Sequence, residues 1–344
     1  MKILAQQLKT VAKTLCGYSA KVIFAGNRAY AIGDTITIVL GLCFDLGTFA
    51  VDAQKFKEVT GRFDGEVDVE VGNLLKLKHK RSKIELPVEK DVFVPKIAGL
   101  AGAGQLFNTK GLMDMLSFVQ QASERKDMYS YAGVVSVMSR SGHLTAVATD
   151  GKRVAIASGS PCSEFIPLLV PVPVLAVLKA LAPLSASGIA ISEDQANIYF
   201  QCGEALVVAR RLAQPFPNWE SIIPKTFNLK ISVKGADMKQ CLGDVKAVID
   251  PETQRLNMTI GSEHCELAVD GGPGSARTYC PVTPVESDLF DEVLDYKLVL
   301  NHSFLADFFD ACEGDVLIGV TGESLPLYLE SNNKKLIMLT QKGD

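Results

Sequence analysis

A pattern that recurs three times along the chain sets the strongest limit on its fold. Each copy is an apolar strand that leads into an amphipathic helix: "FDLGTFAVDAQKFKEV" begins at Phe44, "FIPLLVPVPVLAVLKAL" at Phe165 and "YKLVLNHSFLADFFDAC" at Tyr296. These starts lie about 120 to 130 residues apart, which is too long for a solenoid repeat and typical of a repeated domain. The pattern therefore predicts three similar domains in the 344 residues.

The segment after each of these helices alternates polar and apolar residues. It does so over 65–88, 187–212 and 314–341, with short polar turns inside each range. Alternation with a period of two predicts antiparallel hairpins that bury one face. Each copy is also preceded by a segment of helical period, at 1–15, 109–123 and 234–249, and by further hairpin-forming sequence.

The sequence thus predicts an α+β fold of six modules, each a helix with several antiparallel strands, paired into three repeated domains. The boundaries are expected near the Gly/Ala-rich stretch 98–105 and near Pro224. These positions give domains over 1–104, 105–224 and 225–344.

Composition places the chain among soluble globular proteins, because 47% of its residues are apolar and 22% are charged. Its 35 basic and 39 acidic residues give a net charge of −4, which does not exclude a nucleic-acid partner, since clustering matters more than the sum. Eight scattered cysteines without a CxxC pair indicate reduced thiols and a cytoplasmic protein. The first 15 residues lack the uninterrupted apolar core of a signal peptide.

The stretch "AVATDGKRVAIAS", from Ala146 to Ser158, predicts a tight hairpin. Asp150 and Gly151 fit a turn that needs positive φ, and apolar runs flank them. Lys152 and Arg153 follow at once. From the residues alone, these two are either solvated cations or part of a site.

Basic residues recur on the predicted helices at similar spacing. Lys9 and Lys13 lie on the first, Lys55 and Arg62 are seven apart on the second, and Lys239 and Lys246 repeat that spacing on the fifth. The repetition predicts a shared basic surface, and the alternative is a set of ordinary solvated helix faces. Asp307 and Asp310 on the sixth helix make such a surface uneven.

The order of these elements resembles the bacterial DNA polymerase III β subunit family, the sliding clamps. Three passages carry the resemblance in the right order: "AVATDGKRVA", "FPNWESIIPK" (Phe216 to Lys225) and "LPLYLESNNKKLIMLTQ" near the end. The resemblance covers nearly the whole chain. It implies three clamp domains, each with two helices packed on curved antiparallel sheet, and a head-to-tail ring of two chains.

The resemblance also implies a function without catalysis. The ring would encircle duplex DNA without reading its sequence and tether the polymerase, the clamp loader and other clamp-motif proteins, in the cytoplasm and at the nucleoid. Cations facing phosphates supply sequence-independent, salt-sensitive attraction. The residues expected to face DNA are Lys9, Lys13, Lys55, Arg62, Arg125, Lys179, Lys239 and Lys246. No cofactor or metal is expected.

Two contact surfaces carry over from the family. For the homodimer contact, Ile84 and Leu86 with basic neighbours would meet Val248 and Ile249 with acidic neighbours, since apolar centres with opposite charged rims suit an interface. Their alternative is a role as ordinary edge-strand residues. For the partner peptide, with its Leu and aromatic anchors, the matching pocket positions are Thr149, Gly151, Lys152, Arg153, Val154, Pro217, Ile222, Leu336 and Met338.

The sequence departs from the family at several of these places. Lys152 replaces a usual His, Met338 is followed by Leu-Thr where the family commonly has Pro-Met, and the first domain is short. These departures are compatible with a divergent clamp, such as one from a phage or mobile element. A second hypothesis is a clamp-like protein that stays monomeric and acts as a peptide-binding scaffold.

An enzyme is not expected. Asp150 with Lys152 and Arg153 lacks the Gly-rich strand-to-helix loop that cradles a phosphate. Ser160 and its neighbours lack the G-x-S-x-G context of a nucleophile elbow.

Overall fold

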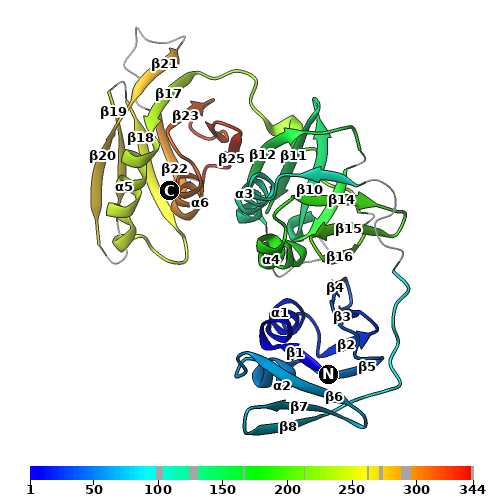
Figure 1. Ribbon diagram of the computed structural model, residues 1–344. Helices are drawn as coiled ribbons and strands as arrows, with labels where there is room; N and C mark the ends of the chain where they lie inside the picture. Colours follow the sequence, from blue (N-terminus) through cyan, green and yellow to red (C-terminus); the bar gives the residue numbers. More distant parts are fainter. Residues whose placement is uncertain are drawn as a thin grey trace. The chain divides into compact units, whose positions relative to one another are not determined.

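The computed structural model describes residues 1–97, 104–123, 131–165, 167–212, 214–261, 263–270, 274–287 and 296–341. By its internal contacts the chain divides into two compact units. Unit 1 consists of 1–113 and 173–213, and unit 2 consists of 114–172 and 214–344. Figure 1 shows the chain coloured along its sequence, with helices and strands labelled where there is room.

Unit 1 contains two antiparallel sheets. In spatial order, the four-stranded sheet consists of β1 (Lys2–Leu4), β6 (Glu66–Val71), β7 (Leu74–His79) and β8 (Ser82–Pro87). The eight-stranded sheet consists of β5 (Phe49–Asp52), β2 (Lys21–Ala25), β3 (Arg28–Ile32), β4 (Ile36–Gly41), β16 (Ala205–Arg210), β15 (Asn197–Cys202), β14 (Ile189–Glu193) and β9 (Gln105–Phe107).

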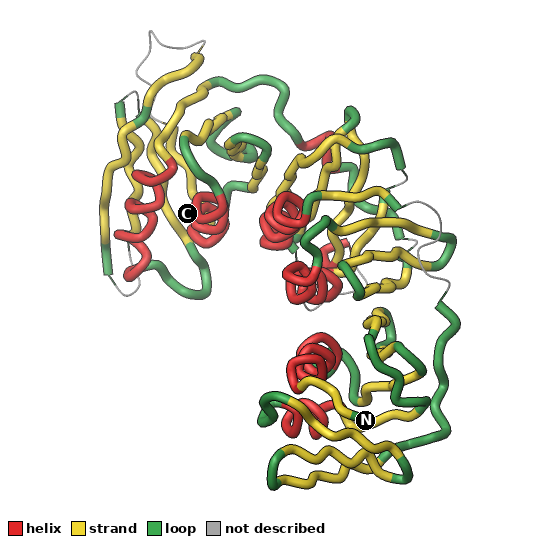
Figure 2. Tube along the Cα trace, viewed as in Figure 1, coloured by secondary structure: helices red, strands yellow, loops and turns green. Residues whose placement is uncertain are grey.

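The helices of the first segment pack against each other and against these strands. α1 (Ala5–Leu15) buries Leu8, Val11 and Leu15, which recur at helical spacing, and α2 (Ala53–Thr60) buries Phe56. Asp52 caps α2 by accepting the Lys55 N–H at 2.8 Å. Figure 2 shows this helix pair beside the strands of the same segment.

Unit 2 also contains two antiparallel sheets. The nine-stranded sheet consists of β13 (Leu168–Pro171), β10 (Val134–Arg140), β11 (His143–Thr149), β12 (Arg153–Pro161), β25 (Lys334–Met338), β24 (Leu327–Ser331), β23 (Asp315–Val320), β17 (Leu229–Lys234) and β21 (Thr283–Ser287). The four-stranded sheet consists of β20 (Ala276–Pro281), β19 (His264–Val269), β18 (Arg255–Ile260) and β22 (Tyr296–Asn301).

α5 (Gly235–Val245) and α6 (His302–Ala311) pack together in unit 2. Asn301 caps α6 by accepting the Phe304 N–H at 3.2 Å, and Leu305, Phe308 and Phe309 on α6 are buried. α3 (Thr109–Val119) and α4 (Val172–Leu181) each span the division between the units. The six α-helices in the described residues are those that the sequence predicts.

Both large sheets run across the predicted domain boundaries. β4 from the first predicted domain pairs with β16 from the second, and β12 from the second pairs with β25 from the third. Paired strands are a continuous unit of packing, which is why each compact unit combines segments from two predicted domains. The stretch 98–103 at the first boundary lies outside the described residues, and the three domain ranges stay predictions.

All eight cysteines are free thiols, and burial raises the pKa of Cys202 to about 12. Among the described residues, no helix is long and apolar enough to cross a membrane.

Candidate functional site: a partner-peptide pocket

The predicted Asp-Gly hairpin turn joins β11 to β12. Gly151 has a φ of 82°, which a residue with a side chain adopts only at a cost. An Asp150 carboxylate oxygen accepts the N–H groups of Lys152 and Arg153, each at 3.0 Å. The Thr149 hydroxyl closes the turn by donating to the Arg153 carbonyl at 2.7 Å. The turn is therefore held rigidly by its own side chains.

The strand pair that follows the turn presents two different faces. Val154 lies opposite Ile337, and Arg153 lies opposite Met338, in the register of β12 and β25. Because side chains alternate along a strand, Val154, Ile337 and the following Leu339 share one face, and Arg153, Leu336 and Met338 share the other. The Leu339 N–H donates to the Lys152 carbonyl at 2.9 Å and continues the pairing beyond β25.

A pocket of about 330 Å³ lies on the first of these faces. Its walls come from the hairpin turn, from the segment around the 3-10 helix η4 (Trp219–Ile222) and from the chain around β25. Apolar side chains dominate it, with Lys152 and Asn218 adding polar groups. Its lining residues are Tyr131, Thr149, Gly151, Lys152, Arg153, Val154, Pro217, Asn218, Trp219, Ile222, Pro326, Ile337 and Leu339.

The structure brings seven of the nine predicted pocket residues together here, namely Thr149, Gly151, Lys152, Arg153, Val154, Pro217 and Ile222. It does not place Leu336 and Met338 in the lining. They are 3% and 0% exposed and lie on the opposite face, and their neighbours Ile337 and Leu339 line the pocket in their place. A shift of one residue along a strand exchanges the two faces, so the predicted positions and the lining residues differ by one step along β25.

Trp219 is the main lining residue that the sequence analysis missed. It is buried and packs with Val154, Ile337 and Tyr328 in one apolar cluster. The Arg140 guanidinium lies over its ring, 4.8 Å from Cζ to the centroid. The tryptophan in the passage "FPNWESIIPK" was the sequence signal that could have identified Trp219.

Tyr328 belongs to the same apolar cluster. Burial, and then a hydrogen bond to Glu330, raise the pKa of Tyr328 to about 12, so its hydroxyl stays protonated and donates to Glu330 at 2.8 Å.

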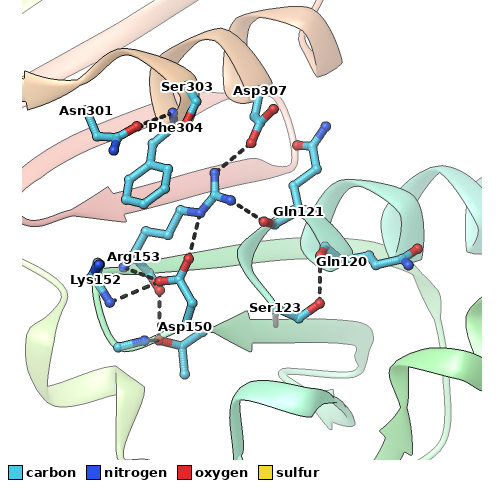
Figure 3. A network of polar contacts seen from close by, with 12 residues as sticks. Gln120, Gln121, Ser123, Asp150, Lys152, Arg153, Asn301, Ser303, Phe304 and Asp307 are labelled. Carbon is cyan, nitrogen blue, oxygen red and sulfur yellow. Dashed lines mark hydrogen bonds and ion pairs between the residues drawn. The ribbon is translucent and has the colours of Figure 1, made fainter. Parts of the chain in front are cut away.

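Arg153 contributes to the lining, but its guanidinium is directed away from the pocket. Figure 3 shows it between the turn and α6. Nε donates to Asp150 at 3.1 Å, a terminal nitrogen donates to Asp307 at 2.8 Å, and the other bonds the Gln121 carbonyl. Its Cζ lies 4.0 Å from the centroid of the Phe304 ring. The Arg153 side chain is 9% exposed, so its positive charge is balanced by groups of the protein and does not face the pocket.

Comparison with curated proteins gives one partial relative. The chain is 26% identical to the beta sliding clamp of Synechococcus elongatus over 199 residues, which are 54% of this chain and 50% of that protein. The chain thus spans about half the length of the curated relative it matches. No protein-family model matches the chain.

Solved structures match over the full length. The DNA polymerase III β subunit of Thermotoga maritima has a TM-score of 0.89 at 16% identity and covers 100% of this chain and 99% of its own. The sliding clamp of Caulobacter crescentus has a TM-score of 0.89 at 17% identity, with 99% of both chains covered. That of Pseudomonas aeruginosa has 0.88 at 15%, covering 100% of this chain and 99% of its own. The chain has the sliding-clamp fold.

In this clamp fold, the predicted DNA-facing cations divide into two groups. Among the described residues, Lys13, Lys55, Lys179 and Lys246 are exposed and form no ion pair. The other three are paired: Lys9 with Asp64 at 3.0 Å, Arg62 with Glu58 at 3.1 Å, and Lys239 with Asp310 at 2.7 Å. Arg62 follows the end of α2, and Lys246 lies in the 3-10 helix after α5. Arg125 lies outside the described residues.

The residues predicted for the dimer contact differ in accessibility. Leu86 and Ile249 are buried within the chain itself, whereas Ile84 and Val248 are half-buried. Ile84 and Leu86 share the face of β8 that lies opposite Leu77 and Leu75 of β7, and those two residues are core. The role of all four in a dimer contact stays a prediction, and Ile84 and Val248 are its more accessible members.

Proposed function

We propose that this protein is a divergent member of the sliding-clamp family, a DNA processivity factor that encircles duplex DNA and tethers its partners through the pocket on unit 2. The observation that carries the proposal is the match of the whole chain to clamp structures. A tether of this kind needs no bond-making chemistry. It needs a closed ring, a weakly attractive lining and a place to hold partners.

The pocket suits a short peptide with apolar anchors. Its about 330 Å³ lie within the usual range for sites that hold a small ligand or a few side chains. Burying one apolar anchor contributes about 1.5–3 kcal/mol, so two or three anchors less the ordering costs give roughly micromolar binding. The Caulobacter crescentus structure has polyethylene glycol bound at a region proposed to tether the beta motif. The polymerase, the clamp loader and other clamp-motif proteins are the expected partners here.

The expected dimer contact is consistent with charge. Lys80 and Arg81 precede β8 and Lys83 lies within it, and β8 is an edge strand of its sheet. Asp250 and Glu252 follow Ile249. Edge strands are templates for pairing with another chain, and opposite charges at the rim favour a head-to-tail arrangement over a like-with-like one.

The mass in solution separates the ring from the alternative of a monomeric peptide-binding scaffold. We expect static light scattering at about 1 to 10 micromolar protein, the affinity range of many specific assemblies, to give twice the 37.1 kDa of one chain. A clamp-motif peptide should leave this mass unchanged, because the pocket is built within one chain. A mass of one chain throughout this range would reject the ring and favour the scaffold.

The salt dependence of DNA association tests the cation assignment. Replacing Lys13 and Lys55 together by Gln should lower the log–log salt slope by about 0.9 for each phosphate that the variant no longer neutralises, measured by fluorescence anisotropy on a duplex. Replacing Lys9 and Arg62 by Gln is the matched control, since each is already neutralised by an acidic neighbour. A slope lowered more by the control pair than by the exposed pair contradicts the assignment.

A further inference from the structure

Two cations with largely buried side chains stand at opposite ends of the β12–β25 pair. Arg153 begins β12 opposite Met338, and Lys334 begins β25 opposite Ala157. Their side chains are 9% and 10% exposed. A buried charge is costly unless it is paired and hydrogen-bonded. Both cations therefore require defined partners, and each has a carboxylate partner on a helix that belongs to the other predicted domain.

The first of these arrangements, the Arg153 strap, runs from β12 to α6. Its partners on that helix are Asp307, 2.8 Å from a guanidinium nitrogen, and the ring of Phe304. Asp150 and the Gln121 carbonyl hold the remaining donors. Figure 3 shows the guanidinium with Asp150 on one side and Asp307 on the other. A planar fork held on three sides fixes the stem of the side chain as well.

The second, the Lys334 strap, runs the opposite way, from β25 to α3. The Lys334 ammonium lies 3.0 Å from Asp114 and donates to the Ala311 carbonyl at the end of α6 at 2.9 Å. It also lies 5.6 Å from the centroid of the Phe118 ring. Phe118 in turn meets Phe308 edge to face, with centroids 5.9 Å apart, so an aromatic contact lies between the helices that the two straps reach.

The corresponding strand pair in unit 1 has apolar residues at the matching positions. β4 and β16 also pair over five residues, from Ile36 opposite Ala209 to Leu40 opposite Ala205. Ile36 thus corresponds to Arg153, and Ala205 to Lys334. Beside Leu40 and next to Ala205, unit 1 has a cavity of about 240 Å³ lined in part by Thr10, Leu184 and Glu204. The strand pairing common to both units therefore forms without the straps. The straps occur only at the strand pair that carries the peptide pocket, among these two pairs.

We propose that the two straps position the pocket walls, and that Asp307 and Asp114 control partner-peptide affinity although neither lines the pocket. The pocket has walls from two predicted domains: the turn at Arg153 from the second, and Ile337 with Leu339 from the third. The straps tie these domains together on the opposite face of the same strand pair. Arg153 and Lys334 are then positioning residues, and the peptide is held by their apolar neighbours. This inference rests on the proposed peptide-binding function.

The expected mechanism is preorganisation. Without Asp307, one guanidinium donor loses its carboxylate, and the Arg153 side chain and the turn that carries it gain freedom. Peptide binding must then also order the Arg153 side chain and the turn, and the free-energy cost of this ordering lowers the affinity. No group that touches the peptide is removed. Coupling between charged neighbours of this kind amounts to about a fivefold change in affinity.

The test uses Asp307→Asn and Asp114→Asn in the full chain, with Asp310→Asn as the matched control. Asp310 lies on the same helix and has its own partner, Lys239. The probe is a fluorescein-labelled peptide, Ser-Leu-Ser-Leu-Phe, whose Kd is measured by anisotropy. We expect the Kd to rise about fivefold for Asp307→Asn and less for the more exposed Asp114→Asn, by screening. Asp310→Asn should match the unaltered protein, and Asp307→Glu should largely restore binding.

Amide hydrogen exchange over 149–154, measured on the same variants without peptide, separates this inference from the proposed function. Faster exchange in Asp307→Asn but not in Asp310→Asn is expected. If the unaltered protein does not bind the probe, the proposed peptide-binding function is wrong. The exchange rates over 149–154 still show whether Asp307 orders the turn. Unchanged exchange together with unchanged Kd in Asp307→Asn overturns the inference, as does an equal effect of Asp310→Asn. Thermal unfolding of each variant checks that it is folded.

Discussion

Protein loaded onto nicked circular DNA is expected to remain bound in high salt and to leave as soon as the circle is cut. Electrostatic binding to phosphates weakens steeply with salt, whereas a closed ring is held by topology and slides off only at a free end. Loading with a clamp loader, gel filtration in high salt, and restriction cleavage of half the sample measure the two fractions. Equal retention on intact and cut DNA would contradict the proposal that the protein forms a closed ring around DNA.

The control for this experiment weakens the expected dimer contact. Ile84→Asp puts a charge at a half-buried position beside the predicted acidic rim of the other chain, and like charges across an interface disfavour association. Such a variant should lose retention on intact circles while it still binds the clamp-motif peptide, because the pocket lies within one chain. Full retention by an Ile84→Asp protein that light scattering shows to be monomeric contradicts encirclement.

The double substitution Ile222→Ser with Leu339→Ser should weaken binding of a clamp-motif peptide about 30-fold without loss of fold. Both side chains line the pocket and are about half exposed, at 44% and 51%. Covering the exposed half of each contributes about 1 kcal/mol, so the pair contributes about 2 kcal/mol, which is about 30-fold in Kd. Anisotropy measures the Kd, and urea unfolding should show a free energy of unfolding close to that of the unaltered protein.

Two further variants serve as controls for the pocket assignment. Leu106→Ser changes an exposed leucine of unit 1, 63% accessible, and should leave peptide affinity unchanged. Met338→Ala, on the other face of β25, removes a fully buried side chain and should lower the free energy of unfolding by about 2–5 kcal/mol. If the Kd is insensitive to Ile222→Ser with Leu339→Ser, the pocket assignment is wrong.

The repeat, the six helices and the position of the pocket turn could all be predicted from the sequence. Each depends on a local pattern: helical spacing such as Leu8, Val11 and Leu15, strand alternation, or an Asp-Gly pair between apolar runs. The two large sheets could not be described in this way. Their central pairings, β4 with β16 and β12 with β25, join segments that lie more than a hundred residues apart.

The position of Leu336 and Met338 outside the pocket lining has a definite physical origin. Strand β25 lies inside a nine-stranded sheet and its apolar residues 336–338 are buried on both faces. A strand buried on both sides reads as a continuous apolar run and does not indicate which face a residue takes. The pairing of Val154 with Ile337 decides it, and that pairing exists only in the folded chain.

The charged residues divide in the same manner. The sequence by itself determined that Lys152 and Arg153 follow a tight turn, and that Asp307 makes the sixth helix acidic. Only the tertiary structure decided that Arg153 and Asp307, which are 154 residues apart, form an ion pair, and that Arg153 turns away from the pocket it borders. Local periodicity follows from the geometry of one helix or strand, whereas the partner of a charge depends on strand pairings between distant segments that no local pattern encodes.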